Sequence, residues 1–402
     1  MCGALAFCGA ASLSRAASPS GQDMPVGDIL GWHQIYADDF TTNVALGNFP
    51  AAVSSKWSAY TDGTKDNSGF VYYWATRTVS IANGILDIYV HTENGQHLDA
   101  AIYPKISTFG QLYGRYSVRF RADALPGYGG VWLLWQDSNT PAWPAQGEID
   151  FPEGNFNGTM TANAHYANAG GGFSQYPTTT TYSGWHTATT EWSPGKEVFI
   201  LDDHVIGVST HQVPSTSMHL VFQSGSSGGN PSDTVSGHIQ VDWVTMYAPS
   251  STATGPIPML TYEAEGLPLL ASSGDTVRDF TDSQMSNGAG SIIDATAAAD
   301  YMTYMVPSVA AGTYTVLVGT KKYNTRGIFQ LSANRADGSG NSSNVGGATD
   351  EYTSVATYPE INLGSWTPGS TSDKAFKFTV TGKNASSSGY GIAIDYIKLV
   401  PQ

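Results

Sequence analysis

The chain has 402 residues, a length typical of two or three domains, and 41% of them are hydrophobic, which is enough for cores of ordinary size. Its formal net charge of −15 repels phosphate backbones and therefore excludes nucleic acid as the expected ligand. The same charge disfavours polyanionic polysaccharides, so a neutral polymer fits best.

Aromatic residues are unusually frequent in a chain that carries few charges. They reach 12% of the sequence, with 22 Tyr and 10 Trp, whereas charged residues make up only 13%. This balance is typical of extracellular all-β proteins with aromatic binding surfaces. Sugar rings and stacked bases are the usual partners of such surfaces. Because the charge excludes nucleic acid, the composition indicates a polysaccharide.

Residues 1–22 resemble a secretion signal or a disordered leader, in which an apolar run precedes small residues and a stretch rich in Ser and Pro. Both cysteines, Cys2 and Cys8, lie in this segment, so the remaining sequence holds no disulfide and no thiolate metal site. No later segment has the ~18 uninterrupted apolar residues of a membrane span. We expect a secreted monomer without a membrane span.

Residues 23–248 are predicted to form a large antiparallel β-sandwich. Short alternating runs separated by Gly, Asn and Pro recur along this stretch, and helical periodicity is absent. In the run "YGRYSVRFR", Tyr116, Val118 and Phe120 face one way and the arginines face the other, as a sheet with one buried face requires. Many such strands over about 225 residues favour two packed sheets.

Residues 249–259 are predicted to be a linker, because this stretch is rich in Pro, Ser and Thr and carries no charge. Residues 260–402 again show strand patterns, for example "GTYTVLVGT" and "GIAIDYIKLV". Their length suits a second, smaller β-sandwich. The expected fold class is therefore all-β, with two sandwiches.

Three carboxylates crowd into the short stretch "QGEIDFPEGN", at positions 146–155. Side chains two apart on a strand share a face, so Glu148 and Asp150 point together. Glu153 breaks this parity unless one extra residue near Pro152 is accommodated as a β-bulge, where a proline is tolerated. The sequence therefore predicts a bulge that places all three carboxylates on one face.

Two glutamates that converge on one face can hydrolyse a glycosidic bond. Double displacement needs carboxyl groups ~5–5.5 Å apart, one to attack the anomeric carbon and one to protonate the leaving oxygen. Neighbouring negative charge raises the pKa of one group, so that an acid and a base coexist near neutral pH. The alternative, a solvated acidic surface, does not account for the flanking glycines and the neighbouring Trp-bearing strands.

The stretch "GEIDFPE" resembles the signature of glycoside hydrolase family sixteen, Glu-x-Asp-x-x-Glu, in its bulged form. The segments "GWHTATTEWSPGKEVFILDDHVIG" and "VDWVTMY" are similar to later strands of this family, and the resemblance covers most of residues 30–248. It implies a concanavalin-like jelly roll and no cofactor for catalysis. It also implies that Glu148 is the nucleophile, Glu153 the general acid/base and Asp150 the residue that tunes their protonation.

The same resemblance implies substrate-binding and metal-binding side chains. Trp132 matches a tryptophan that precedes the catalytic strand, and Trp143 and His165 fall where the family lines its cleft. Each tryptophan is equally compatible with core packing, and His165 suits a hydrogen-bonded scaffold role better than a catalytic one. Asp242 matches an aspartate that often helps to hold a structural calcium, although a single aspartate specifies no metal.

The ends of the C-terminal segment, "TYEAEG" and "IDYIKLVP", resemble those of carbohydrate-binding modules of families six and thirty-five, which are galactose-binding-like β-sandwiches. The resemblance implies that Glu263, Glu265 and Asp395 gather around a structural calcium, a cation that prefers oxygen ligands. Alternatively, the two glutamates lie on an exposed strand face. The middle of this segment departs from the family pattern, so no sugar-binding residue is carried over.

Taken together, the residues predict a secreted, retaining endo-glycosidase that acts on β-1,3 or mixed-linkage β-glucan and carries a C-terminal sugar-binding module. Two alternatives stay open. One is an agar-type galactan hydrolase of the same family, and the other is a non-catalytic, lectin-like protein that binds polysaccharide. The intact acidic triad favours catalysis over binding alone.

Overall fold

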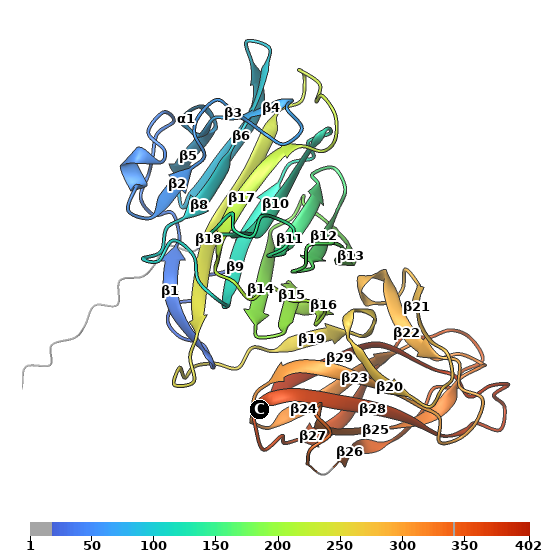
Figure 1. Cartoon of the computed structure of the whole chain (residues 1–402). Coiled ribbons are helices and arrows are strands. Elements are labelled where there is room, and N and C mark those ends of the chain that lie inside the picture. The colour runs from blue at the N-terminus through green and yellow to red at the C-terminus, as the bar shows by residue number, and fades with distance from the viewer. Residues whose placement is uncertain (1–17, 341) are drawn as a thin grey trace, which may run out of the picture.

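A computed structural model describes residues 18–340 and 342–402 (Figure 1). The described chain is nearly all-β, which confirms the predicted fold class. Within it, no helix is long and apolar enough to cross a membrane. Most of the signal-like segment, including both cysteines, lies outside the described residues.

Between residues 18 and 249, the structure contains one short α-helix, α1 (Ala75–Thr78), and one 3-10 turn, η1 (Ala51–Val53). Its strands are, in chain order, β1 (Trp32–Asp38), β2 (Trp57–Ala59), β3 (Thr64–Lys65), β4 (Val71–Tyr73), β5 (Val79–Ala82), β6 (Ile85–Glu93), β7 (Gln96–Asp99), β8 (Ala101–Pro104), β9 (Gly114–Ala122), β10 (Tyr128–Gln136), β11 (Glu148–Asn155), β12 (Thr159–His165), β13 (Phe173–Thr181), β14 (His186–Ser193), β15 (Lys196–Leu201), β16 (His204–Ser209), β17 (Met218–Ser226) and β18 (Gly237–Pro249).

The later part contains two 3-10 turns, η2 (Ala264–Gly266) and η3 (Ser286–Gly288). Its strands are β19 (Leu260–Glu263), β20 (Leu269–Ser272), β21 (Val277–Thr281), β22 (Ala289–Ile293), β23 (Tyr301–Val309), β24 (Tyr314–Thr320), β25 (Gly327–Arg335), β26 (Ser343–Asp350), β27 (Glu360–Trp366), β28 (Ser372–Lys383) and β29 (Ile392–Pro401).

Two packed sheets form the N-terminal sandwich. One sheet has the strand order β13-β12-β11-β10-β17-β8-β2. In the other, β18 pairs with β1, β6 and β9, and β14 joins β9 to β15 and β16. Tyr116, Val118 and Phe120 alternate into the core between the sheets, as the sequence predicts. Their outward neighbours on β9 are Ser117 and three arginines, so the polar and apolar side chains alternate between the two faces of the strand.

The C-terminal sandwich builds on the outer surface of the first. Its five-stranded sheet has the order β20-β23-β28-β25-β26, and a facing group of strands includes β19, β24 and β29. Strand β19 pairs in parallel with β16, matching His204 with Thr261. Val198 and Ile200 of β15 belong to the core cluster of the second sandwich, whereas Phe199 between them belongs to the first. One strand therefore serves both cores through its alternating faces.

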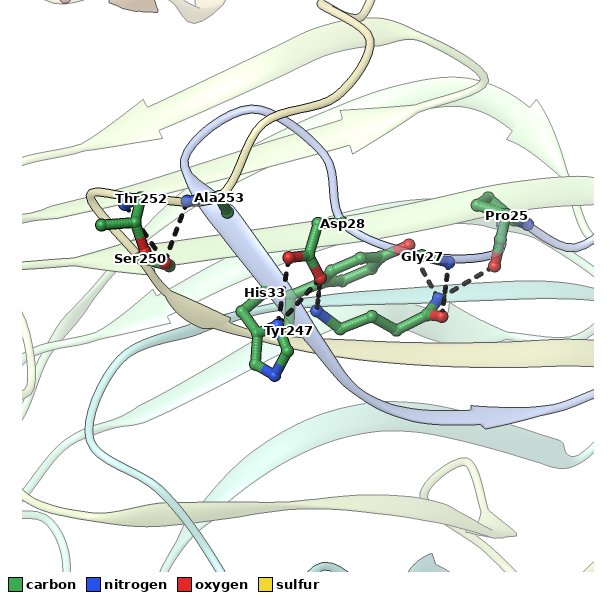
Figure 2. Close-up of polar contacts among 9 residues, drawn as sticks. Pro25, Gly27, Asp28, His33, Tyr247, Ser250, Thr252 and Ala253 are labelled. Atoms are coloured by element: carbon green, nitrogen blue, oxygen red, sulfur yellow. Dashed lines mark hydrogen bonds and ion pairs between the residues drawn. The ribbon is translucent and has the colours of Figure 1, made fainter.

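The segment predicted as a linker, 249–259, lies against the N-terminal turn before β1. The backbone of Ser250 donates a hydrogen bond of 2.9 Å to the oxygen of Gly31, and Gly31 donates one of 3.3 Å to Ala253. Figure 2 shows Ser250 and Ala253 beside the turn that Asp28 helps to close. These contacts hold the segment in place. The domain boundaries at 248 and 259 stay a prediction.

Candidate active site

Strand β11 carries the acidic motif in the middle of its sheet and contains one extra residue. On the β12 side, Asp150 pairs with Asn163 and Glu153 pairs with Thr161, so three steps on β11 match two on β12. The pairing with β10 shows the same extra residue on β11, because three steps on β11 again match two on its partner. The extra residue lies at 151–152, where the sequence predicts a bulge.

A glycine directly precedes this strand for a steric reason. Gly147 has a φ of +72°, a left-handed conformation that favours glycine. A Cβ at this position would lie 2.7 Å from the backbone oxygen of His165 on the neighbouring strand. The glycine therefore allows the close approach that places Glu148 next to His165.

The three carboxylates share one polar network. Glu148, Asp150 and His165 each place one ligand atom within 4.8 Å of those of the other two. The Nε2 atom of His165 lies 2.9 Å from Oδ2 of Asp150. Asn163, opposite Asp150, donates a hydrogen bond to Glu153. The side chains of the motif therefore converge on one face of the sheet.

Burial and mutual repulsion keep part of this cluster protonated. Desolvation, followed by the charge of Asp150, raises the pKa of Glu148 to about 9. The side chain of Asp150 is almost fully buried, which raises its pKa well above the usual range, and the charge of Glu153 adds to the effect. The imidazole of His165 acts in the opposite direction and lowers the pKa of Glu148. The pair formed by Glu148 and Asp150 therefore retains a proton near neutral pH.

Aromatic rings flank the cluster. Trp143 is 47% exposed, and its ring centroid lies 6.3 Å from that of His165. Phe173 of β13 is 51% exposed and lies 5.3 Å from the same imidazole. The structure thus brings the predicted Trp143 and His165 together beside the carboxylates and adds Phe173.

The prediction that Trp132 binds substrate is wrong. This side chain is only 3% exposed and packs in the core, with ring centroids 5.5 Å from Phe120 and 5.0 Å from Phe222. Alternation along β10 turns Trp132 inward. It turns Trp135 to the carboxylate face, where the register of β10 and β11 places it opposite Glu148.

Further residues of the site were not predicted from the sequence. Tyr60 lies close enough to Glu148 for the carboxylate charge to help raise the pKa of its phenol, after burial and Tyr103. Gln175 donates a 3.0 Å hydrogen bond to Asn163. The parity of "TANAHY" indicates that Asn163 and His165 share a face, whereas no local signal indicates Tyr60.

A pocket of about 360 Å³ opens beside Glu153. Its walls include Asp66, Tyr73 and Gln223, together with the backbone of Gly129 and its neighbours on β10. The carboxyl group of Glu153 is therefore accessible to a ligand.

The residues predicted to bind calcium occupy two other places. Asp242 is buried and accepts hydrogen bonds from the Ser18 hydroxyl and the Ser20 backbone. Glu263, Glu265 and Asp395 are mutually close, since the charge of Glu263 helps to raise the pKa of each of the other two.

Two buried oxygen atoms in this second group, Oε2 of Glu263 and Oε2 of Glu265, have no hydrogen-bond partner, so the oxygen-rich donor set fits a hard cation. Among the described residues, only Glu148, Asp150 and His165 bring three potential metal-ligand atoms within 4.8 Å of one another. These residues belong to the acidic face of β11 and β12 and not to the group around Glu263.

Residues 66–245 match the family model described as "Glycosyl hydrolases family 16". This segment is a glycosyl hydrolase family 16 domain. It contains the three motif carboxylates together with His165 and Trp143, and the prediction that the protein is a glycoside hydrolase is confirmed.

Several solved structures are similar to the chain over 55% of its length. The catalytic domain of an endo-1,3-beta-glucanase (laminarinase) from Thermotoga petrophila is 18% identical over 55% of this chain and 100% of that chain, with a TM-score of 0.44. The laminarinase from Rhodothermus marinus is 21% identical over 55% of this chain and 98% of that chain, with a TM-score of 0.44. Beta-agarase A, solved in complex with oligoagarose, is 16% identical over 55% of this chain and 93% of that chain, with a TM-score of 0.43. No curated protein matches the chain.

Proposed function

We propose that the family 16 domain is a retaining endo-glycosidase that hydrolyses β-1,3 or mixed-linkage β-glucan. The observation that carries the proposal is the extra residue at 151–152, because it brings Glu153 to the face that already holds Glu148 and Asp150. Two glutamates on one face of a strand provide the nucleophile and the acid that double displacement requires.

In the first step, the Glu148 carboxylate attacks the anomeric carbon while Glu153 donates its proton to the departing glycosidic oxygen. Attack requires an ionised Glu148, so in the reacting state the proton retained by the pair must reside on Asp150, whatever its place in the free enzyme. The greater burial of Asp150 supports this distribution, because burial disfavours charge. The hydrogen bond from Asn163 orients Glu153 toward the leaving oxygen.

In the second step, water hydrolyses the glycosyl ester on Glu148. Glu153, now ionised, removes a proton from this water, so both carboxyl groups return to their starting states. Because each step inverts the anomeric carbon, the product keeps the configuration of the substrate. His165 acts as a positioning residue that holds Asp150 through the 2.9 Å contact.

The substrate is expected to be a neutral glucan. The net charge of −15 and the acidic face disfavour sulfated polymers. The exposed rings of Trp143 and Phe173 and the half-buried ring of Trp135 lie on the carboxylate face and suit the apolar faces of sugar rings. An agar-type galactan is the alternative substrate within the same enzyme class.

The substrate test measures new reducing ends after incubation with laminarin, lichenan, agarose and carrageenan. We expect release from laminarin or lichenan. If reducing ends are released from agarose alone, the substrate is a galactan and not a β-glucan. If none of the four polysaccharides is cleaved, a protein that binds polysaccharide without hydrolysing it is favoured. A proton NMR time course on the active substrate should show retained anomeric configuration, and inverted first product would refute double displacement.

We further propose that residues 260–402 form a sugar-binding module of a secreted monomer, which tethers the enzyme to its polymer and raises its local concentration. Glu263, Glu265 and Asp395 would hold a structural calcium there, and Asp242 would help to hold another in the catalytic domain. The buried, partner-free oxygen atoms of Glu263 and Glu265 support the first of these sites. Catalysis itself needs no cofactor in this proposal.

A further inference from the structure

The face that carries the catalytic carboxylates leads into a groove between the two sandwiches. The groove has a volume of about 750 Å³. Its N-terminal wall is β13, and its C-terminal wall is formed by β21, η3 and the start of β22; these segments lie next to each other in Figure 1. Both sandwiches therefore contribute to one concave surface.

A continuous row of polar side chains connects this groove to the active site. Asp150 on β11 pairs with Asn163 on β12, and Asn163 pairs with Gln175 on β13. Asn163 also hydrogen-bonds both Glu153 and Gln175. Gln175 lines the groove and, at two strand spacings of ~4.8 Å, its backbone lies roughly 10 Å from that of Asp150. A polymer that crosses the strands at the active site reaches the groove.

The C-terminal wall is built onto the catalytic sheet. Strand β13 is the last strand of its sheet, and its edge is met by Asn287 of η3. The Asn287 side chain donates to the Pro177 oxygen at 3.3 Å and accepts from the Thr179 backbone at 3.3 Å. It also donates to Glu265 at 3.0 Å. Together with the parallel pairing of β16 and β19, these bonds fix the groove between two docked sandwiches.

The lining chemistry identifies a neutral sugar chain as the occupant. The groove presents the amide of Gln175, the hydroxyl of Thr179 and the carboxylate of Asp279, which donate to and accept from sugar hydroxyl groups. Phe280 on the same wall provides an aromatic ring for stacking. The acidic lining, like the net charge, disfavours an anionic polymer.

We infer that this groove holds the continuation of the glucan chain that is bound in the active site, so that the C-terminal sandwich supplies a remote substrate subsite of the enzyme. This inference rests on the proposed function. It differs from simple tethering, because a subsite in register with the catalytic residues acts on the same chain that is being cleaved.

The test compares a long and a short substrate. Phe280→Ala should lower kcat/KM on laminarin about tenfold, the equivalent of one good contact, and leave kcat/KM on laminaritetraose unchanged. The matched control is Tyr301→Ala, which removes a ring of the same sandwich that lies under Lys377 and does not line the groove. This control should keep the ratio of the two kcat/KM values at the wild-type level.

A second variant blocks the groove from the other wall and covers the case in which Phe280→Ala fails to fold. Thr179→Trp changes an exposed side chain of β13 and should produce the same selective loss on laminarin. If both folded variants leave the laminarin-to-tetraose ratio unchanged while the wild type cleaves glucan, the subsite inference alone is wrong. If the wild type cleaves no β-glucan, the proposed function fails and the inference fails with it.

Discussion

Two clusters of three carboxylates lie in the two sandwiches of this protein. One is Glu148, Asp150 and Glu153, named the catalytic cluster here after its proposed role, and the other is Glu263, Glu265 and Asp395, named the module cluster after the proposed sugar-binding module. Both clusters are buried enough to raise carboxyl pKa values: Glu148 to about 9, Glu265 to about 8 and Asp395 to about 7. In each of these three, desolvation is the largest cause. A raised pKa by itself therefore does not distinguish a catalytic site from a structural one.

The clusters differ in how they are built and in what can reach them. The catalytic cluster comes from one strand, opens onto a pocket beside Glu153 and is flanked by exposed rings. The module cluster joins both ends of the C-terminal sandwich through the pairing of β19 with β29, and Glu263 is completely buried. A candidate catalytic site is therefore better recognised by a pocket that a ligand can enter and by exposed aromatic rings than by the number of carboxylates.

Replacing one carboxylate in each cluster should produce the largest difference in activity between the two clusters. Glu148→Gln should lower kcat by about 10⁴-fold or more, because it removes the nucleophile without changing the shape of the side chain. Glu263→Gln should leave kcat on laminaritetraose near the wild-type value. Steady-state kinetics on that oligosaccharide measure both. Near-normal turnover by Glu148→Gln would refute its role as nucleophile.

Within the catalytic sandwich, the two tryptophans of β10 should differ in their effects on stability and on substrate binding. Trp132→Ala should lower the free energy of unfolding by about 3–5 kcal/mol, because it leaves a large cavity in the core. Trp135→Ala should leave stability nearly unchanged and raise KM about tenfold through the loss of a ring on the carboxylate face. Urea unfolding and kinetics separate the two effects. A large loss of stability in Trp135→Ala would place that ring in the core as well.

Local patterns in the sequence predicted the features that depend on neighbouring residues. Strand parity in "GEIDFPE" placed Glu148 and Asp150 on one face, and the odd position of Glu153 indicated the extra residue that the register contains. The choice between Trp132 and Trp135 could have followed from the same parity. It required knowing which face of β10 is buried, and that depends on the opposing sheet.

Contacts between distant segments were beyond the reach of such patterns. Tyr60 approaches Glu148 from a loop far away in the sequence, and Asn287 meets the edge of β13 across the two sandwiches. The composition of 249–259 predicted a linker but not its hydrogen bonds to Gly31. Long-range pairing of this kind is decided by burial of whole faces, which no short stretch encodes.

The module cluster should respond to calcium. At a free calcium concentration 100 times the Kd, the ion should stabilise the folded chain by about 2.7 kcal/mol, because it neutralises buried carboxylates that otherwise repel one another. Differential scanning calorimetry in EDTA and in excess calcium measures the change. Glu263→Gln should lose most of this response. An identical thermal midpoint in both buffers, with no heat of binding by titration calorimetry, would contradict a calcium site.

The smallest expected effect is a change in how stability depends on pH. Burial raises the folded-state pKa of Glu148 from an ordinary value of 4.5 to about 9, so its protonated form is favoured by folding. Stability from this group is fully present below pH 4.5 and is lost as the pH rises toward 9. Glu148→Gln cannot ionise and should therefore be more stable than the wild type at pH 8 by about 1–2 kcal/mol.

Urea unfolding at pH 5 and pH 8 tests this sign. Tryptophan fluorescence suits the measurement, because nine of the ten tryptophans precede residue 249 and report on the catalytic sandwich. Glu93→Gln on β6, where the side chain is 42% exposed, is the matched control and should keep the wild-type slope. If Glu148→Gln also keeps that slope, Glu148 is ionised in the folded protein, and the proton retained by the pair lies on Asp150 alone.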